Sequence, residues 1–156
     1  MTDAALHDPL DRPAASRSAK PEWFDPAGPT LLGQTCTTCR AVFFPPTSEF
    51  CQNPACEGET FDIVPLSRRG TVWSWTTNHY KPPAPAVSAE PFVPYTVVAV
   101  ELAAEGLVVL GQLSDTTPAV AVGDGVELVA ETLLVDDLGE QLVWRWALEP
   151  KDGGER

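Results

Sequence analysis

The sequence predicts a mainly β protein in two parts, a short cysteine-bearing module followed by a five-stranded β-barrel. Three observations lead to this prediction. All four cysteines of the 156-residue chain lie between residues 36 and 56. From Gly70 onward, runs rich in valine, threonine and tryptophan alternate with short glycine-containing turns. No convincing amphipathic helix follows residue 65.

The cysteines form two close pairs, Cys36 with Cys39 and Cys51 with Cys56, with eleven residues between them. Two such pairs can hold one ion from two tight turns, and four thiolates leave tetrahedral Zn²⁺ no open position for substrate. Two disulfides are the alternative, but three aspartates and no apolar core segment in residues 1–18 argue against a secretory signal. A redox CxxC would need no second pair and normally sits at the start of a helix. Here Pro45 and Pro46 follow soon after the first pair, which speaks against a long helix. The spacing predicts a structural zinc ribbon, with Zn²⁺ favoured over iron.

Composition shifts divide the chain into four segments. These are a mobile arm over residues 1–20, an anchor and ribbon over 21–65, a barrel over 66–150 and a polar tail over 151–156. Trp23 and Phe24 stand between prolines at the start of the second segment. Because aromatic side chains bury a large area, we expect them to anchor against the folded body, or otherwise against a partner.

The barrel is predicted from five strands joined mostly by short turns. Their expected ranges are Gly70–Asn78, Tyr95–Leu102, Leu107–Leu113, Val126–Leu134 and Gln141–Leu148. Five strands in about 85 residues fit an OB-fold, although strand count alone does not separate it from an SH3-like barrel. Trp73 with Trp75, and Trp144 with Trp146, are spaced to share a face, either as an aromatic platform or as barrel core.

One connection is long and proline-rich, running from His79 to Pro94 with five prolines. A stiff loop between two core strands favours a functional role. His79, Tyr80 and Lys81 begin it, and a polar strand end is a better interpretation of them than acid–base chemistry, because no partner carboxylate or nucleophile is placed beside them.

Charge and hydropathy exclude two classes of partner. The net charge is −12 and the pI is about 4.4, so the chain should repel nucleic acid. No apolar run approaches the ~20 residues that span a bilayer. We therefore expect a cytoplasmic protein that contacts neither nucleic acid nor membrane.

Taken in order, several motifs resemble the DUF35 family. They are Trp23-Phe24, Leu31-Leu32-Gly33 before the first cysteine pair, Phe44-Pro45-Pro46, the second cysteine pair, Gly70-Thr71-Val72-Trp73-Ser74-Trp75-Thr76, and Pro91-Phe92-Val93-Pro94-Tyr95. The resemblance covers roughly residues 20–150. It implies a rubredoxin-like zinc ribbon and a C-terminal OB-fold, with Cys36, Cys39, Cys51 and Cys56 as metal ligands. Arg40 departs from the glycine that many relatives carry after the CxxC.

The resemblance also implies a role without catalysis of its own. Family members accompany thiolases and aldolases that act on acyl-CoA in steroid side-chain, fatty-acid or aromatic-acid metabolism, and stabilise them or help to shape their acyl-CoA site. The chain would then be a component of a thiolase or retro-aldol lyase complex. Residues expected at partner contacts are Trp23, Phe24, His79, Tyr80, Lys81 and Phe92.

Two other functions remain open from the sequence. The chain could bind acyl-CoA by itself, for which Arg68 and Arg69, with Lys81, are the few cations available to phosphates. It could also be a zinc-ribbon/OB protein that binds nucleic acid, which the charge of −12 disfavours.

Overall fold

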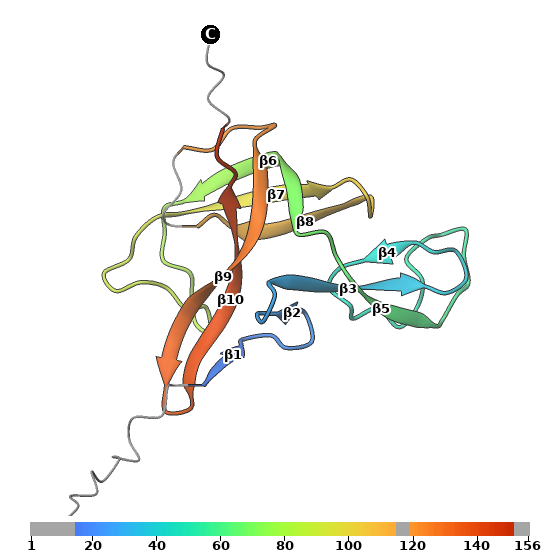
Figure 1. Ribbon diagram of the computed structural model, residues 1–156, viewed down its shortest axis with the longest axis horizontal. Helices are drawn as coiled ribbons and strands as arrows, with labels where there is room; N and C mark the ends of the chain where they lie inside the picture. Colours follow the sequence, from blue (N-terminus) through green and yellow to red (C-terminus); the bar gives the residue numbers. More distant parts are fainter. Residues whose placement is uncertain (1–14, 115–118, 152–156) are drawn as a thin grey trace, which may run out of the picture.

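The computed structural model describes residues 15–114 and 119–151. Within these residues every regular element is a β-strand, arranged in two sheets (Figure 1). None of the described segments forms a helix long and apolar enough to cross a lipid bilayer. The predicted mainly β class is confirmed.

The first sheet is the ribbon, built around β3 (Thr30–Cys36). β2 (Phe24–Asp25) pairs with the first residues of β3, while β4 (Val42–Phe43) and β5 (Phe61–Pro65) flank its second half. All three partners run antiparallel to β3. The strand therefore links the anchor segment at one end to the first cysteine at the other.

The second sheet contains the five predicted barrel strands and one more. They are β6 (Arg69–Asn78), β7 (Tyr95–Leu102), β8 (Leu107–Gln112), β9 (Gly125–Asp136), β10 (Gly139–Leu148) and β1 (Ser16–Ser18), in the order β1-β10-β9-β6-β7-β8. A bridge between Leu113 and Trp146, reinforced by Ser114 N donating to Trp146 O at 2.8 Å, joins the end of β8 to β10. This contact closes the sheet into a barrel.

The sixth strand corrects the predicted extent of the arm. Ser16–Ser18 runs parallel to β10, opposite Glu140, Gln141 and Leu142, so at least this part of residues 1–20 is ordered on the barrel. Arg17 donates a hydrogen bond to Asp136 in the turn region of the β9–β10 hairpin. A short polar segment gives no periodic signal in sequence, and its pairing depends on a partner more than 100 residues away. Residues 1–14 lie outside the described residues.

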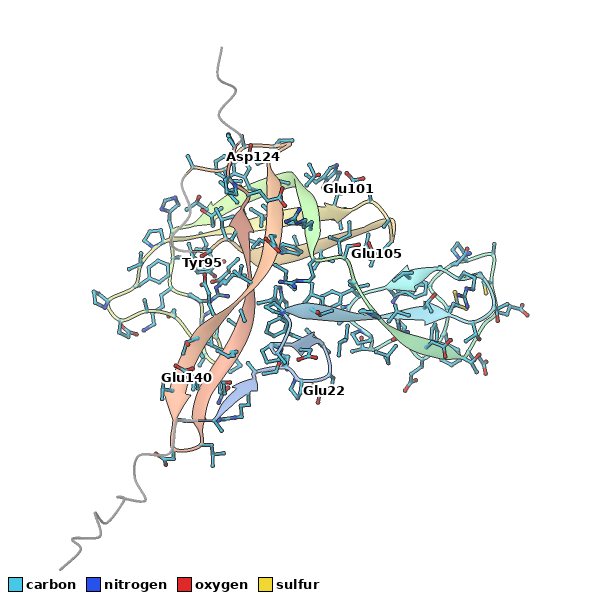
Figure 2. All side chains as sticks on the ribbon, viewed as in Figure 1. Glu22, Tyr95, Glu101, Glu105, Asp124 and Glu140 are labelled. Carbon is cyan, nitrogen blue, oxygen red and sulfur yellow. The ribbon has the colours of Figure 1, made fainter. Side chains whose placement is uncertain are left out.

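Ribbon and barrel share one hydrophobic core. Phe24 and Leu31 from the ribbon, and Leu66 from the segment leaving it, belong to the same buried cluster as Val98 and Trp146 of the barrel. Beyond Leu66, Ser67 donates to Glu105 Oε1 from its backbone N at 2.7 Å and from its hydroxyl at 2.8 Å. Figure 2 shows Glu105 at the β7–β8 turn, beside the segment that leaves the ribbon. These contacts fix how the ribbon projects from the barrel.

Gly111 on β8 provides a test of the barrel core. A Cβ at this position would lie 2.7 Å from the indole of Trp146 and 3.0 Å from Nε1 of Trp144. Because both rings are packed, Gly111→Ala should destabilise the fold by about 1–3 kcal/mol in urea unfolding. Gly28→Ala is the control, since nothing lies within 4 Å of its Cβ position. Equal stabilities of the two variants would contradict this packing.

The β1 attachment predicts a pH dependence. Arg17, with Gln141 and the N–H of Leu138, lowers the pKa of Asp136 to about 2. A carboxyl group whose pKa is depressed from about 4 stabilises the fold above that pH, and this contribution is lost as the pH falls toward 2. Arg17→Ala should raise the pKa of Asp136 toward its ordinary value, as followed by carboxyl carbon NMR. Lys151→Ala is the control, because Lys151 pairs with Asp124 at 3.2 Å and should leave Asp136 unchanged.

Candidate metal centre and partner surfaces

The first cysteine pair lies on a tight turn at the end of β3. Cys36 is the last residue of the strand, and Arg40 N donates to Cys36 O at 2.9 Å to close the turn. Arg40 adopts a φ of 66°, in the left-handed region that glycine enters most easily. A glycine would adopt this conformation at little cost, whereas its cost for an arginine is roughly 1–2 kcal/mol.

The second cysteine pair is folded by its own turn residues. Asn53 accepts hydrogen bonds from Cys56 N at its carbonyl, 2.9 Å, and from Ala55 N at its side chain, 3.0 Å. Cys51 N donates to Gly58 O at 2.9 Å. A Cβ on Gly58 would lie 2.6 Å from Cys36 Sγ, so a glycine is required where the two turns meet.

The two turns bring the four sulfurs together. All four Sγ atoms lie within 4.8 Å of one another, with 3.5 Å between Cys39 and Cys51 and 3.9 Å between Cys36 and Cys56. Tetrahedral Zn–S bonds of about 2.3 Å require sulfur separations of about 3.8 Å. A disulfide needs about 2.05 Å, and all four cysteines are free. The disulfide alternative is therefore wrong for this chain.

Local hydrogen bonds favour thiolate at part of this site. The backbone N–H of Cys39 lowers the pKa of Cys36 to about 6, and the N–H of Ala41 lowers that of Cys39. Burial raises the pKa of Cys51 to about 12. A divalent cation overrides the cost of burial by favouring thiolate at every ligand. The donor set, four sulfurs in tetrahedral spacing, fits a structural zinc ion and leaves no position for a substrate.

The two residues of the aromatic anchor differ in burial, since Phe24 lies in the core and Trp23 is only partly covered. Phe24 is 1% exposed and packs on Trp144 with a centroid distance of 6.0 Å, so its predicted partner contact is corrected to a core role. Trp23 is half-buried, against Phe44 at 6.1 Å and beneath Lys20, whose Nζ lies 5.3 Å from its ring. Core packing, the preferred interpretation of this pair, is confirmed for Phe24.

The proline-rich loop presents its first residues to solvent. His79, Tyr80 and Lys81 are exposed, and Lys81 forms an ion pair with Glu90 across the loop. Phe92 is half-buried against Tyr95, with ring centroids 6.4 Å apart. The exposed members of this set stay predictions as partner contacts, because the structure holds the chain alone.

Beneath the same loop lies a cleft of about 580 Å³ that the sequence did not predict. Its walls come from the loop and from four barrel strands: Val87, Ser88, Ala89, Val93 and Pro94 of the loop, and Tyr95, Gln112, Thr132, Leu133 and Arg145 of the strands. Arg145 is paired with Glu131 at 3.7 Å. These residues are scattered over four strands and a loop, so no local sequence pattern identifies them as a group. The one signal in the sequence is that Arg145 alternates with Trp144 and Trp146, which places it on the opposite face of its strand from these two core residues.

The two arginines suggested for a phosphate are already paired. Arg68 lies 3.8 Å from Glu127, and Arg69 lies 3.2 Å from Glu149. Both pairs are largely exposed, so each contributes little stability, yet each reduces the positive charge offered to a ligand.

The two tryptophan pairs have different surroundings. Trp144 and Trp146 face the interior, where Trp146 is completely buried, so the core interpretation holds for this pair. Trp73 lies within a bulge of β6, and both Trp73 and Trp75 remain exposed, at 64% and 46%. Of the two tryptophan pairs, the β6 pair is therefore the one that offers aromatic area to solvent.

Comparison with known proteins gives matches to both parts of the chain. Residues 27–62 match the family described as "ChsH2, rubredoxin-like zinc ribbon domain", and residues 63–131 match "ChsH2, C-terminal OB-fold domain". The chain is 34% identical over 109 residues to benzoylsuccinyl-CoA thiolase subunit BbsA of Thauera aromatica, covering 70% of this chain and 69% of that protein. Among solved structures, the Ltp2-ChsH2(DUF35) aldolase matches with a TM-score of 0.57 and 30% identity, over 86% of this chain and 98% of that chain.

A four-thiolate ribbon followed by a small closed barrel defines a class of structural zinc proteins. Within this class, the chain belongs to the DUF35 family, since it matches the ChsH2-type ribbon and the OB-fold in sequence order. The predicted OB-fold is thereby confirmed over the SH3-like alternative.

Removal of one ligand tests the metal centre. Cys39→Ser should lose its zinc, because three thiolates hold the ion far less tightly, and amides of residues 31–64 should lose protection from hydrogen exchange. The barrel strands should keep most of their protection. Thr38→Ser, in the same turn, is the control and should retain zinc. Full zinc occupancy in Cys39→Ser, measured by plasma emission spectroscopy, would refute the four-thiolate assignment.

Proposed function

We propose that this chain is a non-catalytic accessory subunit that binds and stabilises a thiolase-fold partner acting on acyl-CoA. The main support is its 34% identity to a protein named as a thiolase subunit. The solved structure that it resembles is likewise named as an aldolase with a DUF35 component. The partner's substrate would belong to steroid side-chain, fatty-acid or aromatic-acid metabolism.

The chemistry of the described residues supports a role without catalysis. The metal is held by four thiolates and so has no open position at which to polarise a substrate. His79 lies exposed at the end of β6, and none of the hydrogen bonds or ion pairs found among the described residues involves it. The nucleophile of an acyl-CoA reaction would therefore come from the partner. A site that keeps four reduced cysteines also suits the cytoplasm.

The surface supports binding to another protein. Large apolar side chains, among them Tyr80 on the loop, Trp73 on β6 and Leu110 on β8, are each more than 60% exposed. Such residues are enriched at protein interfaces when they are not scattered singly. The cleft beneath the proline-rich loop would then lie near the partner's acyl-CoA site and help to shape it.

Independent acyl-CoA binding has less support. CoA carries several phosphate charges, and the two arginines considered for them are paired with Glu127 and Glu149. The net charge of −12 opposes both CoA and nucleic acid.

Co-purification tests the proposed function. The tagged chain, co-expressed with the thiolase-like protein of its own host, should elute as a hetero-oligomer of defined stoichiometry and should raise the melting temperature of that protein. Cys39→Ser should weaken the complex, whereas Thr38→Ser should not. In parallel, calorimetry of the isolated chain with acetyl-CoA should show no heat. A chain that stays monomeric beside its partner, or that binds acetyl-CoA alone, would overturn the proposal.

A further inference from the structure

The ribbon tip, defined as the exposed residues Glu49, Phe50, Glu57, Glu59, Asp62 and Ile63, carries two large apolar side chains with little cover. Phe50 is 64% exposed and Ile63 is 60% exposed. The ribbon projects from the barrel, so the barrel does not cover its far end (Figure 1). The far end of the ribbon therefore offers two large apolar side chains to a partner.

Hydrogen bonds hold these two side chains in one region of the ribbon. Gln34 on β3 donates from Nε2 to Ser48 O at 3.0 Å and accepts from Ser48 N at 3.2 Å. Ile63 on β5 is paired in register with Gln34, and Phe50 is two residues beyond Ser48. The backbone segments that carry the two apolar residues are therefore both tied to Gln34 before any partner arrives, which lowers the entropy lost on docking.

The same surface is strongly negative. Residues 36–63 contain four acids, Glu49, Glu57, Glu59 and Asp62, against Arg40 alone, which gives −3. Zn²⁺ with four thiolates adds −2. Among the described residues, none of these four acids has an ion-pair partner, whereas six ion pairs are found elsewhere.

Charge decides between the possible occupants of this surface. A second copy would bring two negative ribbons together, and a nucleic acid would add phosphates to a field that repels them. A protein surface that places lysine and arginine around an apolar hollow would complement both the exposed apolar side chains and the negative charge of the ribbon tip. Oppositely charged rims accelerate association, while a buried aromatic side chain slows dissociation.

We propose that the ribbon tip docks onto a basic surface of the thiolase-fold partner, with Phe50 filling an apolar hollow and the acids around it steering the encounter. This inference rests on the proposed function and names the chemistry of the complementary surface. The zinc ion contributes by fixing the two turns that present the acids. The partner's subunit surface should accordingly be basic where it meets the ribbon.

Association kinetics with the co-purified partner test this inference. Glu57→Lys should lower the association rate constant about fivefold at low salt, with the difference shrinking at high salt because exposed charges are screened. Phe50→Ala should raise the dissociation rate constant about tenfold with little salt dependence. Zinc content of each variant confirms that the ribbon is folded.

The β9–β10 turn offers matched controls. Asp137→Lys makes the same change of charge at an exposed acid, and Leu138→Ala truncates an apolar side chain that is 73% exposed. Both should bind within twofold of the wild type. If wild type binds but the tip variants match these controls, the docking surface is wrong while the proposed function stands. If wild type does not bind the partner at all, the proposed function itself fails. Self-association of the isolated chain that Phe50→Ala abolishes would identify a second copy as the occupant and overturn the inference.

Discussion

The burial of Leu66 between ribbon and barrel is the contact on which the rest of the arrangement depends. Leu66 is 3% exposed, and it fits because Gly33 on β3 has no side chain, since a Cβ there would lie 2.7 Å from Leu66 Cδ2. Its backbone N donates to Leu31 O at 2.8 Å, which extends the pairing of β3 with β5 into the linker. A module of about 30 residues buries too little surface to be stable alone. The shared core and the zinc ion together supply what it lacks.

The parts of this structure that the sequence predicts are those encoded locally. The metal ligands follow from two cysteine pairs that fold within their own turns, and each barrel strand follows from a run of β-branched residues between turn signals. Both depend on neighbours a few positions away. The OB-fold assignment needed more than strand count, because among the described residues the sheet is closed by the contacts of Leu113 and Ser114 with Trp146, which are distant in sequence. It came from the resemblance and is supported by the family match.

What the sequence could not predict depends on distant pairs. β1 exists because Ser16–Ser18 meets β10, and the Arg17–Asp136 pair joins residues 119 positions apart. For Phe24 the sequence favoured packing against the folded body but left a partner contact open, because an aromatic residue between prolines has the same local pattern whether it is buried or exposed. The cleft under residues 79–94 combines a loop with strands far away in sequence. In each case the missing information was tertiary, which no local pattern carries.

The arrangement of the ribbon explains how a four-thiolate site would serve the accessory subunit proposed above. Closing the coordination sphere removes reactivity and leaves order as the only contribution of the metal. The ordered backbone also positions exposed side chains, because Glu49, Phe50 and Glu57 lie within or beside the turns that bind zinc. Arg40 retains its left-handed φ in this setting, although glycine would adopt that conformation at lower cost. A strained turn held by a metal and a shared core is a rigid support, and rigid supports lose little entropy when another protein binds them.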